Sequence, residues 1–598
     1  MRPDELFLPL HPNYRSDAVT ASELFLEFMF WVVVIALAWV LLKTRPSFLQ
    51  KIEDFGKRLS YRRGLVVGLT IVTVIVARVA LLPMLPIPVP LVHDEFSYLF
   101  QAATFASGHL TNPTPAGWTR FETFHINMLP SYHSMYPPAQ AMFLAAAEVI
   151  HVQPWWGVCL STALMCGALC WMLQGWVSPP WALLGSLLCV VRFATYSYWI
   201  NMYFGGSVAA MGAALVIGAL PRLKRTARPR YGLIFALGLA LLANTRPYEG
   251  LVFSIPFLLA VCFWLLKDRI QIPKKVLTIA PALVALTVVV GGMAYYNWRC
   301  TGHPLLFPYT LNQRTYHITR PFVWQERYPI PQYNHRVMRI FYVYHEMQDY
   351  FSRSMTGFYP HFLRERIQVY YDFYVWPLFV LMFVASWQMM KRAKRRIFPI
   401  TVLLVLASLL VVGWPPEPHY ASPIVGVLLI IAIYGFRLAW TWRPKGQPVG
   451  PMFVRSTAIV LLLWSFVPLV QKLFDPFDIA QNSTEHETWI PSQFERARIQ
   501  AKVEQVPGQH IIFMHFHYWE TGAVFWIYND PDPQSSRLIW AYDMGDEANQ
   551  QFMRLYPGRQ AWFLDKTNLN MTPIPYALSG QHIDPLISNY RPGESHGQ

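Results

Sequence analysis

The sequence predicts a polytopic α-helical membrane protein of about 12 spans, with loops on the outer face and a small C-terminal α/β domain. Three observations predict this fold class. The chain of 598 residues is 54% hydrophobic, only 14% charged and has a mean hydropathy of +0.27. Its apolar residues gather in stretches of roughly 20, the length of a helix that crosses a bilayer. Its basic residues gather in the short segments between those stretches.

Each of the expected spans is an apolar stretch, several of them shortened or interrupted by proline and glycine. In chain order they are 24–42, 64–85, 155–177, 180–198, 204–220, 230–246, 248–267, 275–297, 371–390, 397–413, 420–438 and 452–473. The residues before 24–42 lack the basic region of a cleaved signal peptide, so this stretch is expected to remain as a span.

The net charge of +15 sets the orientation and does not indicate a nucleic-acid partner. Segments 43–63, 222–230, 267–275, 391–396 and 437–445 hold 24 of the 49 Lys and Arg residues and only three acids. Short basic segments between spans are typical of cytoplasmic loops. All the basic segments lie on the cytoplasmic side only if residues 138–151 do not cross the membrane. An interfacial or re-entrant helix is therefore expected at 138–151.

Three parts of the chain follow from this topology. Residues 1–63 hold an extra span and a basic cytoplasmic loop, and residues 64–473 form the transmembrane core with outer loops 86–154 and 298–370. Residues 474–598 are expected outside the membrane as a small α/β domain. Helices are expected at 492–505 and 546–555, and strands at "HIIFMHFHYW", "AVFWIYN", "RLIWAYD" and "QAWFL".

The six cysteines suggest neither a disulfide framework nor a zinc site. Five of them lie in expected spans and no CxxC pair occurs, so they are interpreted as small buried apolar residues.

Polar side chains from distant stretches are expected at the same outer face, where charged groups beside spans are usually functional. His93 and Tyr136 belong to the first outer loop and are candidate substrate-binding residues. The other candidates are Asp94 and Glu95 after span 64–85, Arg192 near the end of 180–198, Arg246 and Glu249 between 230–246 and 248–267, and His419 and Tyr420 before 420–438.

This set of side chains suits group transfer from a lipid-borne phosphate donor. An acceptor hydroxyl needs a carboxylate to take its proton, and the departing phosphate needs a cation. Asp94 is the candidate base. Glu95 either supports it or, with Asp94, holds a divalent cation such as Mg²⁺ or Mn²⁺, the only cofactor that the pattern suggests.

Each candidate also has a purely structural interpretation. Asp94 and Glu95 favour a helix N-terminus, and Arg246 with Glu249 is an i,i+3 pair that would lock a turn. Arg192 could snorkel to lipid headgroups, and His419 could be an interfacial hydrogen-bonding residue. His93, His125 and His133 have a spacing that matches no metal-ligand pattern.

Several motifs resemble bacterial membrane glycosyltransferases of the GT-C superfamily, in the protein mannosyltransferase-like group (family 39). They are "HDEFSYLFQAATFASGHLTNPTP", "YPPAQ", "NMYFGG", "ANTRPYEG", "TGHPLLFPYTLNQRTY" and "HYASP", within residues 64–440. The resemblance implies an inverting transfer from a polyprenyl-phosphate sugar, with Asp94 matching the catalytic Asp and Glu95 its acidic neighbour. The extra span 24–42 and the α/β tail depart from the group, so a protein acceptor is not implied.

The expected function is therefore an inverting glycosyltransferase of the bacterial inner membrane, with its C-terminal domain in the periplasm. It would move sugar from a polyprenyl-phosphate donor to a lipid, glycan or protein hydroxyl, with Asp94 as general base and with membrane lipids around it. The alternative is a transporter or flippase of lipid-linked sugars, which would show midplane charges and internal repeats. A polymerase or ligase of surface glycans is a weaker third hypothesis.

Overall fold

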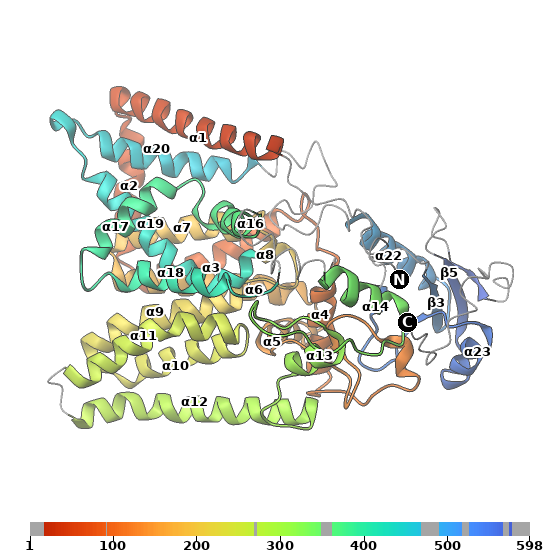
Figure 1. Cartoon of the computed structure of the whole chain (residues 1–598). Coiled ribbons are helices and arrows are strands. Elements are labelled where there is room, and N and C mark those ends of the chain that lie inside the picture. The colour runs from red at the N-terminus through yellow and green to blue at the C-terminus, as the bar shows by residue number, and fades with distance from the viewer. Residues whose placement is uncertain are drawn as a thin grey trace.

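The computed structural model describes residues 17–90, 92–267, 272–347, 361–414, 416–467, 490–516, 526–565 and 573–576. A bundle of roughly aligned helices forms one end of the molecule, and a small sheet flanked by helices forms the other (Figure 1). This is the expected polytopic helical membrane protein with a small α/β region.

The apolar helices of the bundle follow the predicted spans closely. They are α1 (Asp17–Thr44), α3 (Arg63–Ala80), α6 (Trp155–Trp176), α7 (Pro179–Phe193), α9 (Ser207–Thr226), α10 (Pro229–Ala243), α11 (Pro247–Lys267), α12 (Ile272–Thr301), α17 (Phe379–Met390), α18 (Ile397–Leu409), α19 (Val425–Trp440) and α20 (Val449–Trp464). Helix α1, the extra span, packs beside α20 at the edge of the bundle (Figure 1).

Not all of the twelve described apolar helices are long enough by themselves to cross a membrane. Among the described residues, seven helices are long and apolar enough to cross a membrane, and the pair Arg366–Val375 and Phe379–Met390, bent by 92°, makes an eighth if it is one span. The other four, α7, α10, α18 and α20, have 13 to 16 residues and rise only about 20 to 24 Å. Arg192 lies in the last turn of α7 and Arg246 follows α10, so two of these helices end where the polar residues begin.

Short helices connect the spans. They are α2 (Ser47–Ser60), α4 (His93–Ala106), η2 (Trp118–Phe121), α5 (Ala139–Val149), α8 (Tyr198–Asn201), α13 (Pro308–Tyr316), α14 (Arg336–Arg339), η3 (Ile340–His345), α16 (His361–Tyr370), η4 (Tyr371–Val375), η5 (Pro418–Ile424) and η6 (Pro444–Gly446). Helix α5, within the segment expected not to cross, has 11 residues and rises only about 16 Å, which is too short for a bilayer.

The C-terminal region contains a four-stranded sheet in the order β4-β3-β5-β6. Strands β3 (His510–His515), β4 (Leu538–Tyr542) and β5 (Gln560–Asp565) are parallel, and β6 (Ile574–Pro575) is antiparallel to β5. Helices α22 (Ile490–Val503) and α23 (Asp546–Leu555) match the two expected helices. The expected domain boundary at residue 474 lies outside the described residues. So do residues 523–525, the first three of the segment "AVFWIYN" that was expected to be a strand.

The described part of the segment "AVFWIYN", residues 526–529, is not a strand, which corrects the expectation. Trp526 and Ile527 have no exposed surface, and Tyr528 is 6% exposed. The apolar run therefore reflects burial against the rest of the molecule and not strand pairing.

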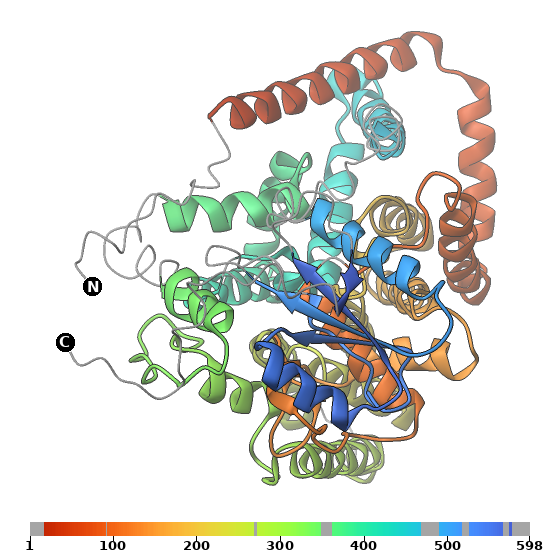
Figure 2. The same cartoon turned by 90° about the vertical axis from the view of Figure 1, so that its right-hand side faces the viewer.

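One face of the sheet covers the first outer loop and α4. Phe96 and Phe100 of α4, with Phe121, Ile126 and Tyr132, form one buried cluster with Ile511, Phe513, Ile539, Phe552 and Tyr556 of the α/β region. Figure 2 shows the sheet in front of the segments around α4. A two-residue ribbon, β1 (Ile126–Asn127) and β2 (His133–Ser134), stiffens the loop beneath it.

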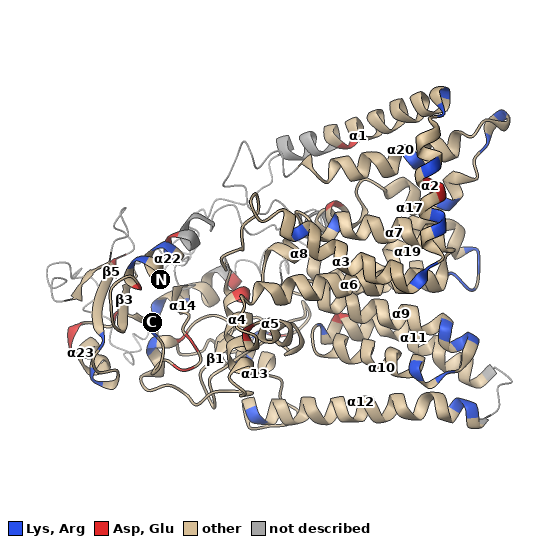
Figure 3. Cartoon of the chain, turned by 180° about the vertical axis from the view of Figure 1, so that it is seen from behind, with Lys and Arg blue, Asp and Glu red and all other residues tan. Residues whose placement is uncertain are grey.

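Lys and Arg residues gather at the end of the bundle remote from the α/β region (Figure 3). By the positive-inside rule, this end is expected in the cytoplasm and α4 on the opposite side. Cys300, in the last turn of α12, has no exposed surface, so labelling of its thiol cannot report the orientation of the chain.

Cysteine labelling tests this orientation. In a Cys262→Ser background, which removes the one exposed cysteine, Leu305→Cys should react with a membrane-impermeant maleimide on intact spheroplasts, because Leu305 is 88% exposed beyond the outer end of α12. Lys394→Cys, exposed in a basic loop, should react only after permeabilisation. The opposite labelling pattern would contradict the orientation.

Candidate active site at the start of helix α4

Helix α4 begins at His93, so the acidic pair occupies its first turn. Carboxylates are favoured there because the first backbone N–H groups of a helix lack intrahelical partners and the helix dipole is positive at that end. The interpretation of Asp94 and Glu95 as the start of a helix is thus correct. It does not say what else each carboxylate does.

Glu95 is the capping residue. Its side chain is fully buried, one carboxylate oxygen accepts a hydrogen bond from Val92 N at 3.2 Å, and the other accepts from Tyr203 N at 2.9 Å. Both oxygens are thereby engaged by backbone amides. These bonds tie α4 to the "NMYFGG" segment and give Glu95 a structural role, while its expected role as a catalytic residue or cation ligand stays a prediction.

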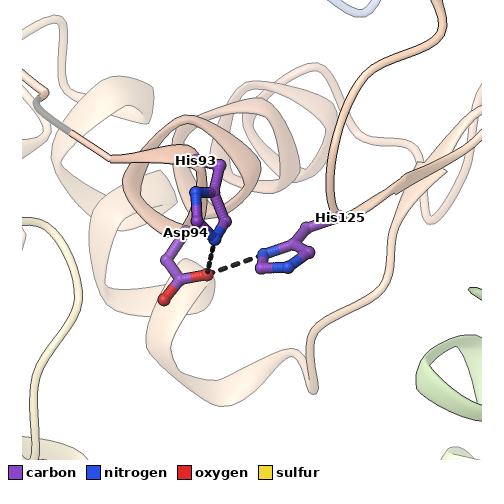
Figure 4. Close-up of side chains that lie close together, drawn as sticks. All are labelled: His93, Asp94 and His125. Atoms are coloured by element: carbon purple, nitrogen blue, oxygen red, sulfur yellow. Dashed lines mark ion pairs between the residues drawn. The ribbon is translucent and has the colours of Figure 1, made fainter. Parts of the chain in front are cut away.

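Asp94 points the other way, into a group of imidazoles and a phenol, and its side chain is 25% exposed. Oδ1 lies 2.6 Å from His125 Nδ1 and 3.7 Å from His93 Nε2, and it accepts a hydrogen bond from the Tyr136 hydroxyl. Figure 4 shows both imidazoles directed at this one oxygen, with Oδ2 turned away from them. No described residue bonds Oδ2, so it is the oxygen available to a substrate.

The surroundings keep Asp94 ionised. Burial alone would raise the pKa of its carboxyl group. The charges of His93 and His125, together with hydrogen bonds from His125 and Tyr136, outweigh this effect and hold the pKa well below its usual range.

His125 is a residue that sequence analysis did not place in the site. It lies 31 positions after Asp94, and no local pattern links the two. Its φ of 60° is in the left-handed region, which is uncommon for a residue other than glycine. Its carbonyl accepts hydrogen bonds from Ser97 Oγ at 2.8 Å and Met135 N at 3.0 Å, contacts that hold this conformation. His133, considered together with it, bonds instead to Ser131 and Asn127.

Tyr136, expected at the site, is there. Its hydroxyl contacts Asp94 and lies 2.7 Å from His125 Nδ1. Its ring stacks on Tyr98 with centroids 4.5 Å apart. Burial raises the pKa of the Tyr98 phenol. The charge of Arg246 lowers this pKa, and the charges of Asp94 and Glu249 raise it further. The Tyr98–Tyr136 stack therefore lies within electrostatic reach of both Asp94 and Arg246.

Arg246 forms a second group with Tyr420 and Glu249. Its guanidinium carbon lies 4.7 Å from the centre of the Tyr420 ring, and Glu249, 9% exposed, follows three residues later in the first turn of α11. The nearby carboxylate and phenols keep this partly buried guanidinium charged. Arg246 is thus a fixed cation beside the phenols that border Asp94.

Arg192 and His419 each contact aromatic residues. Arg192 donates to Phe373 O at 2.9 Å and covers the Phe373 ring at 4.2 Å. His419 is 2% exposed, with Nδ1 3.2 Å from the Tyr198 hydroxyl and its ring 4.9 Å from Phe204. These contacts give both residues a structural role, and a substrate-binding role for them stays a prediction.

One group of described residues could hold a metal ion. Ligand atoms of His93, Asp94 and His125 all lie within 4.8 Å of one another. Asp94 belongs both to this set and to the expected pair of Asp94 and Glu95, which stays a prediction. Two imidazoles and a carboxylate suit Zn²⁺ better than Mg²⁺, which prefers oxygen ligands throughout.

A small apolar pocket lies next to Tyr136 in the chain. It is lined by Met135, Pro137 and Pro138 next to Tyr136, and by residues at the facing ends of α10, α11, α12 and α13. Its volume of about 20 Å³ is enough for about one water molecule and not for a hydrocarbon chain.

Comparison with known proteins identifies the fold. No family model and no curated protein sequence matches the chain. The apo structure of ArnT from Cupriavidus metallidurans is similar over 84% of this chain and 94% of that one, with a TM-score of 0.50 and 13% identity. ArnT bound to undecaprenyl phosphate matches over the same shares with a TM-score of 0.45 and 14% identity. The apo oligosaccharyltransferase of Archaeoglobus fulgidus matches over 78% and 63%, with a TM-score of 0.36 and 9% identity.

The similarity to apo ArnT shows that the chain shares the fold of that protein. The similarity covers most of both chains, so it includes the helical bundle together with the α/β region. At 13% identity it says nothing about individual side chains, whose roles are argued from the geometry above.

Substitution of Glu95 tests its anchoring role. Glu95→Ala would leave two buried N–H groups without acceptors, at a cost of about 3 kcal/mol, and should lower the melting temperature measured in detergent. Glu95→Gln keeps a carbonyl oxygen as acceptor and should lose less. Equal melting temperatures for Glu95→Ala and the wild type would contradict this role.

Proposed function

We propose that the chain is an inverting glycosyltransferase that moves a sugar from a polyprenyl-phosphate donor to an acceptor hydroxyl at the outer membrane face. The observation that carries the proposal is the arrangement of Asp94. Its Oδ1 is held by two imidazoles and a phenol, and its Oδ2 is left for an incoming group. An ionised carboxylate fixed in this way is preorganised to act as a general base.

The reaction then proceeds as one displacement. Asp94 Oδ2 takes the proton of the acceptor hydroxyl as that oxygen bonds to the anomeric carbon of the sugar. The bond between this carbon and the phosphate oxygen breaks, and polyprenyl phosphate leaves with the electron pair. Attack opposite the leaving group inverts the anomeric centre, in keeping with the resemblance to the GT-C superfamily.

Arg246 is the candidate cation for the departing phosphate. A guanidinium can offer two parallel N–H groups to phosphate oxygens, and its charge is strongest where water is excluded. Tyr98, Tyr136 and Tyr420 surround it with phenols that are held in place by stacking and cation–π contacts. The donor headgroup would thus lie between Arg246 and Asp94.

A divalent cation would sit among His93, Asp94 and His125 if the enzyme uses one. When bound, such an ion would neutralise phosphate charge. The imidazoles occupy the Oδ1 side of Asp94, so its Oδ2 would remain available as the base.

The position of the site favours an enzyme over a transporter. Asp94 and Arg246 lie beyond the ends of α3 and α10, at the end of the bundle opposite the basic loops. A transporter that alternates its access is expected to bind its substrate near the midplane of the membrane. The proposed location is the inner membrane of a bacterium, with the α/β domain in the periplasm and an acceptor on a lipid, glycan or protein.

A transfer assay in proteoliposomes tests the base. With a radiolabelled polyprenyl-phosphate hexose, Asp94→Asn should reduce sugar transfer by at least about 100-fold, the range of general-base catalysis. Asp543→Asn is the matched control, because Asp543 is also paired with a histidine, His515 Nδ1 at 2.7 Å, but lies in the α/β domain. Full transfer by a folded Asp94→Asn variant would remove Asp94 from the mechanism.

Metal analysis tests the cation site. Protein purified without chelator and equilibrated with Zn²⁺ or Mg²⁺ should retain stoichiometric Zn²⁺ by mass spectrometry, since imidazole ligands favour Zn²⁺. His125→Ala should lose most of it, whereas His133→Ala should not, because His133 is bonded elsewhere. Equal metal content in all three proteins would argue against these ligands.

A further inference from the structure

A tyrosine of the C-terminal α/β region reaches the backbone beside both histidines of the Asp94 group. The Tyr528 hydroxyl lies 2.7 Å from Phe124 O and 3.2 Å from His93 O. The Phe124 carbonyl belongs to the peptide unit that contains the His125 nitrogen, so one side chain contacts the main chain at two separate points of the site.

Tyr528 is itself held from both sides. It is 6% exposed, and its ring stacks on Phe96 of α4 with centroids 4.6 Å apart and planes 9° apart. Arg496 of α22 donates to Tyr528 O at 3.0 Å and to Trp526 O at 3.1 Å. Its guanidinium carbon also lies 4.8 Å from the Phe96 ring. The hydroxyl therefore has a fixed position relative to α4.

The chemistry of these groups makes Tyr528 a donor. Burial raises the pKa of its phenol well above the usual value, a hydrogen bond with Thr123 opposes this effect, and the charge of Asp94 adds to it, so the hydroxyl keeps its proton. Both backbone oxygens can only accept. The single hydrogen is directed mainly to Phe124 O, the nearer acceptor, with His93 O at the longer distance.

The peptide before His125 needs such support. His125 adopts a φ of 60°, a conformation that costs free energy for a side chain other than glycine and persists only when surrounding contacts enforce it. Ser97 and Met135 hold the carbonyl of His125, on the C-terminal side. Tyr528 holds the peptide on the N-terminal side.

We propose that Tyr528 is a positioning residue of the active site: by holding the Phe124 and His93 carbonyls, it fixes the imidazoles of His125 and His93 against Asp94 Oδ1. The inference rests on the proposed function of Asp94. It assigns the α/β region a part in building the site, beyond any separate binding role. Tyr528 does not contact Asp94 or the open Oδ2, so its effect passes through the two histidines.

Tyr528→Phe tests the proposal, with Tyr556→Phe as matched control. Tyr556 is also buried in the α/β region and donates to a carbonyl of the same outer loop, Ala116 O at 2.9 Å, but that carbonyl does not adjoin a histidine of the site. Each change removes one hydroxyl and keeps the ring. Tyr528→Phe should lower kcat for sugar transfer about tenfold with the donor KM unchanged, the size of one lost hydrogen bond. Tyr556→Phe should retain kcat, with a similar change in melting temperature.

A second measurement does not depend on sugar transfer. Diethylpyrocarbonate modifies imidazole nitrogens, and mass spectrometry of peptides gives the rate at His125 relative to exposed His151. Tyr528→Phe should increase this relative rate several-fold, and Tyr556→Phe should not, because only the first loosens His125.

The outcomes separate the two proposals. If the wild type transfers no sugar but Tyr528→Phe alone increases His125 modification, the proposed function fails and the positioning role stands. If the two variants match in kcat and in His125 modification, the positioning role is overturned, whatever the reaction. A further loss of kcat from Tyr528→Phe in a background that carries both His93→Gln and His125→Gln, equal to that in the wild type, would also overturn it, because the effect could not then pass through either histidine.

Discussion

The site depends on the burial of the Glu95 carboxylate. A fully buried charge persists only when hydrogen-bond donors surround it, and here the donors are the backbone amides of Val92 and Tyr203. The two bonds fix the start of α4 against a segment more than 100 residues away in the chain. Because the helix start cannot rotate, Asp94 is presented to the opposite side, where His125 and Tyr136 meet it.

Two parts of the chain that are far apart in sequence complete this site. The first outer loop supplies His125 and Tyr136, and the α/β region covers that loop and contacts its backbone through Tyr528. A second link is Arg120, 5% exposed, which donates to the Tyr542 carbonyl of β4. Contacts of this kind join the C-terminal region to the loop, and the sheet residues Ile511, Phe513 and Ile539 are buried in the cluster between them.

The sequence determined the membrane architecture because hydropathy and charge are local properties. Each expected span contains an apolar helix, and α22 and α23 lie within two residues of their predicted positions. The place of Asp94 at the start of a helix also followed from the residues themselves. Where the local pattern was ambiguous it misled: residues 526–529 are apolar because they are buried, and they pair with no strand.

Only the tertiary structure decided which polar residues share a site. Neighbouring residues of a helix point about 100° apart, so Asp94 and Glu95 separate although they adjoin in sequence. His125 joins Asp94 through a left-handed turn and long-range contacts that no spacing encodes. Arg192 lies at the expected level but is bound to Phe373. The sequence by itself thus determined the helix ends at which polar groups gather, whereas side-chain direction and partner choice depended on packing between distant segments.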